Sequence, residues 1–171
     1  MAGLIYNGCG DNVFKLDLKA LAPSEQEGLF FKTLAGYLES GLPLMSNLAN
    51  AAAVIATFHP ELNWVGFYLE RDGDLVLGPF QGKPACTRIA SGKGVCGTAM
   101  AMRQTLLVPD TAKFPGHIVC DSDSKSELVV PIIKNGRVAG VLDLDSPFIG
   151  HFSESDRLRF EKAVMILVDF F

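Results

Sequence analysis

Two of the four cysteines lie in segments rich in glycine, proline and serine, a composition typical of loops. Cys86 lies in PACTRIASGKG, and Cys120 lies in FPGHIVCDSDS. Thiols in loops that can approach each other are suited to reversible disulfide chemistry. Asp121 and Asp123 follow Cys120, and negative charges disfavour the reactive thiolate form. Either Cys120 is therefore an inert cysteine, or the nearby acids serve another part of a reaction.

The spacing of the cysteines argues against a metal site. The intervals from Cys86 to Cys96 and from Cys96 to Cys120 match no zinc or iron–sulfur pattern, and His117 would add one ligand only. His117 could instead be the base of a cysteine hydrolase, but a histidine in the same loop as its nucleophile lacks the usual geometry. We therefore expect no metal site.

Asp143 and Asp145 occur in VLDLDSP, directly after the apolar residues of an interior strand. Side chains alternate between the two faces of a strand, so both carboxylates point one way while Leu142 and Leu144 point the other. Two carboxylates on one face repel each other unless they meet a cation or share protons. The pattern indicates either a functional site or a solvated sheet face, and both alternatives stay open.

The stretch NWVGFY places Trp64, Gly66 and Tyr68 on one face of a predicted strand and Val65 and Phe67 on the other. Two aromatic side chains around a glycine could form a shallow apolar slot, with room for a ligand over Gly66. Such a slot suits a methyl group or a sulfonium-like centre. Core packing is the alternative, because aromatic side chains on one strand face are more often core than pocket.

Gly92, Gly94 and Gly97 match the spacing of a dinucleotide-binding loop in SGKGVCG. That function requires a strand–helix–parallel-strand unit, whereas hairpins surround this segment, so we do not expect a dinucleotide. The backbone N–H groups at a helix start near Gly94 could hold a small carboxylate. A glycine turn that only begins a helix is the alternative.

Helix signals occur at both ends of the chain. SEQEGLFFKTLAGYLES is predicted to be a helix with Ser24 at its N-cap and Glu27 completing a capping box. The C-terminal segment from 152 to 171 is predicted to be another helix, with Ser153 and Asp156 as its capping box. Further helices are predicted at LMSNLANAAAVIATF and GVCGTAMAM.

Two β-hairpins are predicted between these helices. Asp72-Gly73 joins LNWVGFYLER to DLVLGPFQ, and Asn135-Gly136 joins ELVVPIIK to RVAGVLDLD. QTLLVPD is predicted to be a further short strand. Hairpins flanked by helices indicate an α+β fold, with a central antiparallel sheet and the helices packed mainly on one side.

Composition limits the classes of partner. The 171 residues are 49% hydrophobic and 20% charged, with a net charge of −4. This favours one globular domain, over 24–171 after an N-terminal arm at 1–23, and argues against nucleic acid or a membrane as partner. No secretory signal is evident, so we expect a cytoplasmic protein whose cysteines are reduced at rest.

Five spaced blocks of this sequence resemble the free methionine-(R)-sulfoxide reductases, which are built on a GAF domain. The blocks are NWVGFYL, GPFQGKPACTRI, GKGVCGTA, HIVCDSDSKSELVVPI and GVLDLDSP. The resemblance extends from about residue 24 to 165 and includes three cysteine positions that a generic GAF domain does not share. It implies a GAF-like fold and a thiol-dependent oxidoreductase that acts on the free amino acid, in the context of oxidative stress.

The resemblance also implies residue roles. Cys120 attacks the sulfoxide and becomes a sulfenic acid, which a second thiol converts to a disulfide. We favour Cys86 as that resolving residue, with Cys96 as a third thiol that relays or substitutes. A thioredoxin-type dithiol then regenerates the enzyme, and this implied reaction needs no metal or organic cofactor. Cys9 has no role in the resemblance.

The remaining implied roles concern the substrate. Glu127, Asp143 and Asp145 are the acids on the substrate side, with Glu127 and Asp145 in the chemical step and Asp143 in binding. Trp64 and Tyr68 enclose the S-methyl group, and Gly94 lies where the substrate carboxylate binds. Of the acids near Cys120, we assign Glu127 to the site and expect Asp121 and Asp123 to face solvent.

A second class of function is compatible with the same fold. A GAF module can bind a small ligand, or sense redox state, without catalysing a reaction. The resemblance is compatible with a homodimer, but no sequence feature identifies an interface. Which carboxylate donates a proton also stays open, because coupled carboxylates titrate as a set.

Overall fold

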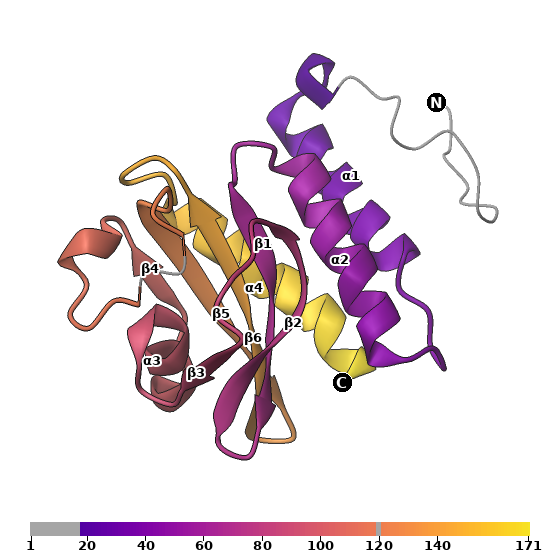
Figure 1. Ribbon diagram of the computed structural model, residues 1–171. Helices are drawn as coiled ribbons and strands as arrows, with labels where there is room; N and C mark the ends of the chain where they lie inside the picture. Colours follow the sequence, from indigo (N-terminus) through magenta and orange to yellow (C-terminus); the bar gives the residue numbers. More distant parts are fainter. Residues whose placement is uncertain (1–17, 119–120) are drawn as a thin grey trace.

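A six-stranded antiparallel sheet forms the centre of the computed structural model, which describes residues 18–118 and 121–171 (Figure 1). The strand order is β3-β2-β1-β6-β5-β4, and every adjacent pair is antiparallel. The strands are β1 (Trp64–Arg71), β2 (Asp74–Gly82), β3 (Arg88–Ala90), β4 (Leu106–Val108), β5 (Ser126–Lys134) and β6 (Arg137–Ser146).

The helices are α1 (Pro23–Gly36), α2 (Leu44–Phe58), α3 (Gly94–Met102) and α4 (Glu154–Leu167). Short 3-10 turns are η2 (Leu18–Ala20), η3 (Thr111–Lys113) and η4 (Val168–Phe170). The predictions for α2, α3 and β4 are confirmed, while the three-residue strand β3 was missed because its sequence, RIA, is too short to show a period. Most of the predicted N-terminal arm, residues 1–17, lies outside the described residues.

Both predicted hairpin turns are confirmed. Asp72 and Gly73 have φ of 55° and 89°, and Asn135 and Gly136 have φ of 51° and 74°. Positive φ at both central residues defines the turn whose twist matches that of paired strands. The two turns therefore set the register of β1 with β2 and of β5 with β6.

The helix start at Ser153 is confirmed, whereas the predicted N-cap at Ser24, with Glu27 as its capping-box partner, is wrong by two residues. Ser153 caps α4, and the Asp156 side chain accepts from the Ser153 backbone N–H at 2.9 Å. The first helix instead begins at Pro23, where the missing N–H and restricted φ of proline suit the first turn. Ala22 is its N-cap residue, and its backbone N–H donates to Glu25 at 3.0 Å.

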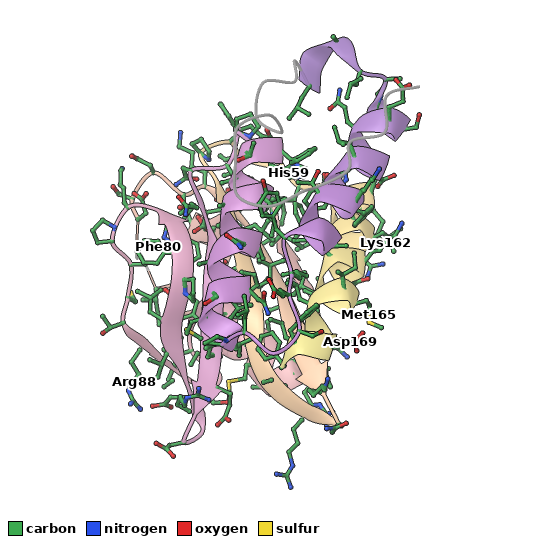
Figure 2. All side chains as sticks on the ribbon, turned by 90° about the vertical axis from the view of Figure 1, so that its right-hand side faces the viewer. His59, Phe80, Arg88, Lys162, Met165 and Asp169 are labelled. Carbon is green, nitrogen blue, oxygen red and sulfur yellow. The ribbon has the colours of Figure 1, made fainter. Side chains whose placement is uncertain are left out.

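The predicted α+β arrangement, with helices mainly on one side, is confirmed. Figure 1 shows α1, α2 and α4 together on one face of the sheet, and α3 beyond the opposite face. Figure 2 views the helical layer from its outer side, with Lys162 and Met165 on α4. Val65, Phe67 and Leu144 pack in the core under the three helices, whereas Trp64 and Tyr68 belong to a second core with α3. Among the described residues, no helix combines the length and apolarity that crossing a membrane requires.

Two helical glycines should respond oppositely to alanine. An added Cβ at Gly97 would lie 2.3 Å from the Ala90 carbonyl oxygen, whereas at Gly28, which is exposed in α1, it would meet nothing within 4 Å. Gly97→Ala should therefore lower the free energy of unfolding by about 3 kcal/mol, because backbone would have to move. Gly28→Ala should raise it by about 1 kcal/mol through helix propensity. Urea denaturation of both variants measures the difference, and equal effects would contradict this account of α3 packing.

Candidate active site

Three carboxylates lie together on the sheet face that carries α3. Strand register pairs Asp145 of β6 with Glu127 of β5 on one side and with Trp64 of β1 on the other. Asp143 lies two residues away on the same face. Glu127 and Asp143 are each 6% exposed, and Asp145 is partly exposed. The predicted shared orientation of Asp143 and Asp145 is confirmed, and the face is not simply solvated.

Burial raises the pKa of all three carboxylates, and repulsion by neighbouring carboxylates adds to the shift at Glu127 and Asp145. Burial raises the pKa of Glu127 well above its usual value, and the charges of Asp143 and Asp145 raise it further. Burial, followed by the charge of Asp143, raises the pKa of Asp145, while a hydrogen bond from Ser124 acts in the opposite direction. Burial raises the pKa of Asp143 to about 6. At neutral pH the cluster therefore holds protons that it can donate.

The free thiol of Cys96 contacts this cluster. Cys96, in the first turn of α3, lies with its Sγ 3.7 Å from Glu127 Oε1. Burial, and then the negative charges of Asp143 and Glu127, raise the pKa of this thiol. On the other side of the carboxylate, His117 Nε2 lies 3.7 Å from Glu127 Oε2. Burial lowers the pKa of His117, which favours the neutral ring.

Of the remaining cysteines, only Cys86 lies among the described residues. Cys86 is disulfide-bonded, whereas Cys96 is free. The predicted nucleophile, Cys120, and Val119 lie outside the described residues. The flanking residues His117, Ile118 and Asp121 are described, and all three line the same cavity. The described residues on both sides of positions 119 and 120 therefore line the same cavity as the three carboxylates.

Two aromatic side chains form one wall of the cavity. Trp64 stacks on Tyr68 with ring centroids 5.9 Å apart, and on Phe80 at 5.4 Å. The Trp64 indole N–H donates to the Lys83 carbonyl at 3.1 Å, which fixes the ring against the loop before Cys86. Trp64 and Tyr68 thus belong to a core and also line the cavity, which combines the two alternatives drawn from the sequence.

The predicted slot over Gly66 is wrong. A Cβ built on Gly66 would lie 2.4 Å from Phe80 Cβ and 2.7 Å from Trp64 Cη2. The glycine therefore makes room for neighbouring side chains of this protein and not for a ligand. The apolar surface available to a ligand is the part of Trp64 and Tyr68 that lines the cavity.

Gly94 begins α3 and lines the cavity with a φ of +58°. A Cβ at this position would lie 3.3 Å from Ile118 Cγ1, so glycine allows the loop of 118 to approach the helix start. Gly92 donates its N–H to the Gly97 carbonyl at 2.8 Å, which closes a local turn. The strands on either side of α3, β3 and β4, lie at opposite edges of the antiparallel sheet, which is not the dinucleotide-binding context.

Asp121 is placed differently from the sequence prediction. Its side chain is only 8% exposed and lines the cavity, whereas Asp123 is 61% exposed as predicted. Lys83 Nζ lies 3.4 Å from Asp121 and also contacts Asp123. Backbone N–H donation from Asp123 and the Lys83 charge lower the pKa of Asp121. Asp121 is therefore an ionised anchor of the loop and is distinct from the protonated cluster.

Sequence reasoning missed Asn63 and Ser124. Asn63 Nδ2 donates to Ser124 Oγ at 2.9 Å and to Asp121 Oδ2 at 3.3 Å. These contacts hold the end of the Cys120 loop against the start of β1. The one sequence signal was the position of Asn63, directly before Trp64. Its hydrogen-bond partners, Asp121 and Ser124, lie about sixty positions later in the chain, so no local sequence pattern could predict these contacts.

Comparison with known proteins agrees with this arrangement. A GAF domain model matches residues 45–167. The free methionine-R-sulfoxide reductase of Escherichia coli (strain K12) is 48% identical over 120 residues, covering 70% of this chain and 73% of that protein.

Two solved structures extend the comparison. The reduced form of fRMsr of Staphylococcus aureus has a TM-score of 0.81 and 44% identity, covering 84% of this chain and 93% of its own. The free methionine-R-sulfoxide reductase from Neisseria meningitidis, in complex with its substrate, has a TM-score of 0.79 and 39% identity, covering 100% and 96%. The chain belongs to the GAF domain family and, within it, to the free methionine-R-sulfoxide reductases.

Proposed function

We propose that this protein reduces the (R)-sulfoxide of free methionine to methionine, with residues 24–171 as a single catalytic domain. The observation that carries the proposal is the carboxylate trio Glu127, Asp143 and Asp145, whose pKa values are raised beside an aromatic wall and a free thiol. A sulfoxide is hard to reduce unless its oxygen is protonated as charge develops, and this trio supplies protons. The relatives that act on free methionine sulfoxide support the choice of substrate.

The cavity offers a complementary surface for each part of the substrate. Ionised members of the trio, Asp143 foremost, hold the ammonium group, and backbone N–H groups at the start of α3 near Gly94 hold the carboxylate. The cavity surface of Trp64 and Tyr68 encloses the S-methyl group. This binding mode requires both a free ammonium group and a free carboxylate on the substrate, so it selects the free amino acid over a peptide.

In the chemical step the Cys120 thiolate takes the sulfoxide oxygen. Cys120 is oxidised to a sulfenic acid while the sulfoxide gains two electrons and leaves as methionine. Glu127 and Asp145 are the proton sources that we assign to the oxygen. The raised pKa of both side chains supports this, since each can be a neutral acid at pH 7.

The sulfenic acid is then resolved by a second thiol. Condensation with Cys86 releases water and forms a disulfide, and a thioredoxin-type dithiol of the cytoplasm reduces that disulfide. The disulfide state of Cys86 supports this assignment. The free thiol of Cys96 is buried with a raised pKa, which makes it a poor first attacker. Cys96 is thus the thiol that relays or substitutes.

The decisive experiment supplies each diastereomer of free methionine sulfoxide with a thioredoxin system and NADPH. We expect consumption of the R form only, with NADPH oxidised in equal amount, and no activity on an N-acetylated or peptide-bound sulfoxide. Binding of the R form without consumption would instead establish a ligand-binding or redox-sensing GAF module. Consumption of the S form would contradict the assignment.

A further inference from the structure

The buried cluster also has the composition of a metal site. We propose that Cys96, Glu127 and Asp143 of the reduced protein bind one zinc ion, which occupies the catalytic cavity and inhibits the enzyme. The zinc ion is an inhibitor and takes no part in the reaction. The inhibition rests on the proposed function, whereas binding of the ion does not.

The geometry of the three side chains fits zinc. One ligand atom from each, the Cys96 Sγ and one carboxylate oxygen of Glu127 and of Asp143, all lie within 4.8 Å of one another. Cys96 Sγ and Glu127 Oε1 are 3.7 Å apart. Tetrahedral zinc, with Zn–S of about 2.3 Å and Zn–O of about 2.0 Å, separates such atoms by about 3.5 Å. Small side-chain rotations therefore complete the coordination.

An unpartnered oxygen provides a second, independent observation. Asp143 is 94% buried, and its Oδ1 has no hydrogen-bond partner among the described groups. A buried carboxylate oxygen without a partner is costly, and a cation offsets that cost. Asp143 also lines the catalytic cavity, so an ion that enters the cavity can reach it.

The donor set selects the kind of ion. Calcium and magnesium require six or more oxygen ligands and do not use a thiolate. Zinc accepts one sulfur and two carboxylate oxygens, and three protein ligands leave a fourth position for water on the cavity side. His117 lies 3.7 Å from Glu127 Oε2, where it can hold the ligating carboxylate in place.

Sequence spacing could not reveal this set. Its ligands come from α3, β5 and β6, and only one is a cysteine. The set includes neither Cys86 nor Cys120, so it differs from zinc bound by the thiol pair of the redox cycle. It does include two of the three carboxylates assigned to the substrate, so zinc and methionine sulfoxide should exclude each other.

The test uses the full-length reduced chain with Cys9, Cys86 and Cys120 all changed to Ser, which leaves Cys96 as its only cysteine. Zinc is titrated anaerobically against a chromophoric zinc indicator, and Co²⁺ is used in parallel. We expect one ion per chain and a sulfur-to-cobalt charge-transfer band. Adding Cys96→Ser or Asp143→Asn should weaken zinc binding at least about 100-fold.

Two results would overturn the site. One is the absence of the cobalt band in the chain that retains Cys96. The other is unchanged zinc affinity after both Cys96→Ser and Asp143→Asn. Thermal unfolding provides a second readout, because zinc at 100 times its Kd should stabilise the binding variant by about 2.7 kcal/mol and the Cys96→Ser chain by at most about 0.4 kcal/mol.

Competition tests the inhibitory part separately. This chain cannot turn over, so free methionine (R)-sulfoxide can be added during the zinc titration. It should raise the apparent Kd for zinc in proportion to its concentration. An apparent Kd for zinc that does not change with sulfoxide concentration would overturn the proposed inhibition at this cavity. A failure of the diastereomer assay on the unmodified enzyme would instead overturn the proposed function and leave the zinc site standing.

Discussion

A Cys120→Ser variant is expected to release no methionine from free methionine (R)-sulfoxide, whereas the unmodified reduced enzyme releases one molecule per chain without added reductant. The serine hydroxyl is not appreciably ionised near pH 7 and does not form a stable oxidised state, so the oxygen has no acceptor. The measurement is amino-acid quantification after pre-reduced, desalted enzyme is mixed with an excess of the sulfoxide.

Two matched variants separate the thiol roles. Cys86→Ser should still release one methionine per chain but lose most of its multiple turnover with a thioredoxin system. Cys96→Ser should keep the single release and much of the recycling. If Cys86→Ser retained full multiple turnover, the resolving role would belong to Cys96. Release of methionine by Cys120→Ser would refute the assignment of the nucleophile.

Glu127→Gln should lower kcat/KM for the (R)-sulfoxide by about 100- to 10,000-fold, the usual contribution of a general acid. The amide keeps the shape of the side chain but cannot donate a proton to the sulfoxide oxygen as the carboxylic acid can. The raised pKa of the Glu127 carboxyl keeps that acid protonated near neutral pH. Asp145→Asn is the paired test of the second proposed donor. The control is Asp123→Asn, an exposed carboxylate on the Cys120 loop, which should stay within a few-fold of the unmodified enzyme.

The carboxylate cluster should also make stability depend on pH. Burial raises the pKa of Asp143 from 3.8 to about 6 in the folded protein, so folding favours its protonated form. This contribution is fully present below pH 3.8 and is lost as pH rises through about 6. Asp143→Asn should therefore be more stable than the unmodified protein above pH 6, by about 3 kcal/mol, with the gain shrinking towards pH 4.

Thermal unfolding between pH 4 and pH 8 measures this difference. The Asp123→Asn control should keep the pH dependence of the unmodified protein, because the exposed carboxylate is outside the buried cluster. A variant at Asp143 that lost stability at pH 8 would mean that its charge is matched by a cation in the folded protein. The expected result is the reverse, a functional group retained at a cost in stability.

Local patterns were enough to predict much of the fold. The hairpin turns at Asp72-Gly73 and Asn135-Gly136, the start of α4 at Ser153 and the range of α3 all depend on residues a few positions apart. Their conformational preferences act within one turn or one helix end, so they can be found in a short stretch of sequence. The predicted N-cap of α1, Ser24, was wrong by two residues, because Pro23 takes the first helical position and leaves Ala22 as the N-cap.

The features of the candidate site likewise divide into those that local sequence predicts and those that only tertiary contacts decide. Strand alternation by itself placed Asp143 and Asp145 on one face, because the direction of a side chain in a strand depends only on its position. Which partners they meet was decided by pairing across strands, which brings Glu127 beside Asp145, and by the packing of α3, which brings Cys96 to Glu127. Burial by these neighbours raises the pKa of the carboxylates.

Asp121 and Gly66 show most clearly what only the tertiary structure decided. The sequence placed Asp121 on a solvated loop, but Lys83 and Asn63, distant in the chain, hold it in the cavity. The space over Gly66 is filled by Trp64 and by Phe80 from the neighbouring strand. The sequence by itself determined the elements and the face that each side chain takes, since those follow from local geometry. Burial, contacts and the charge state of the acids required the folded chain, because they arise between residues that only folding brings together.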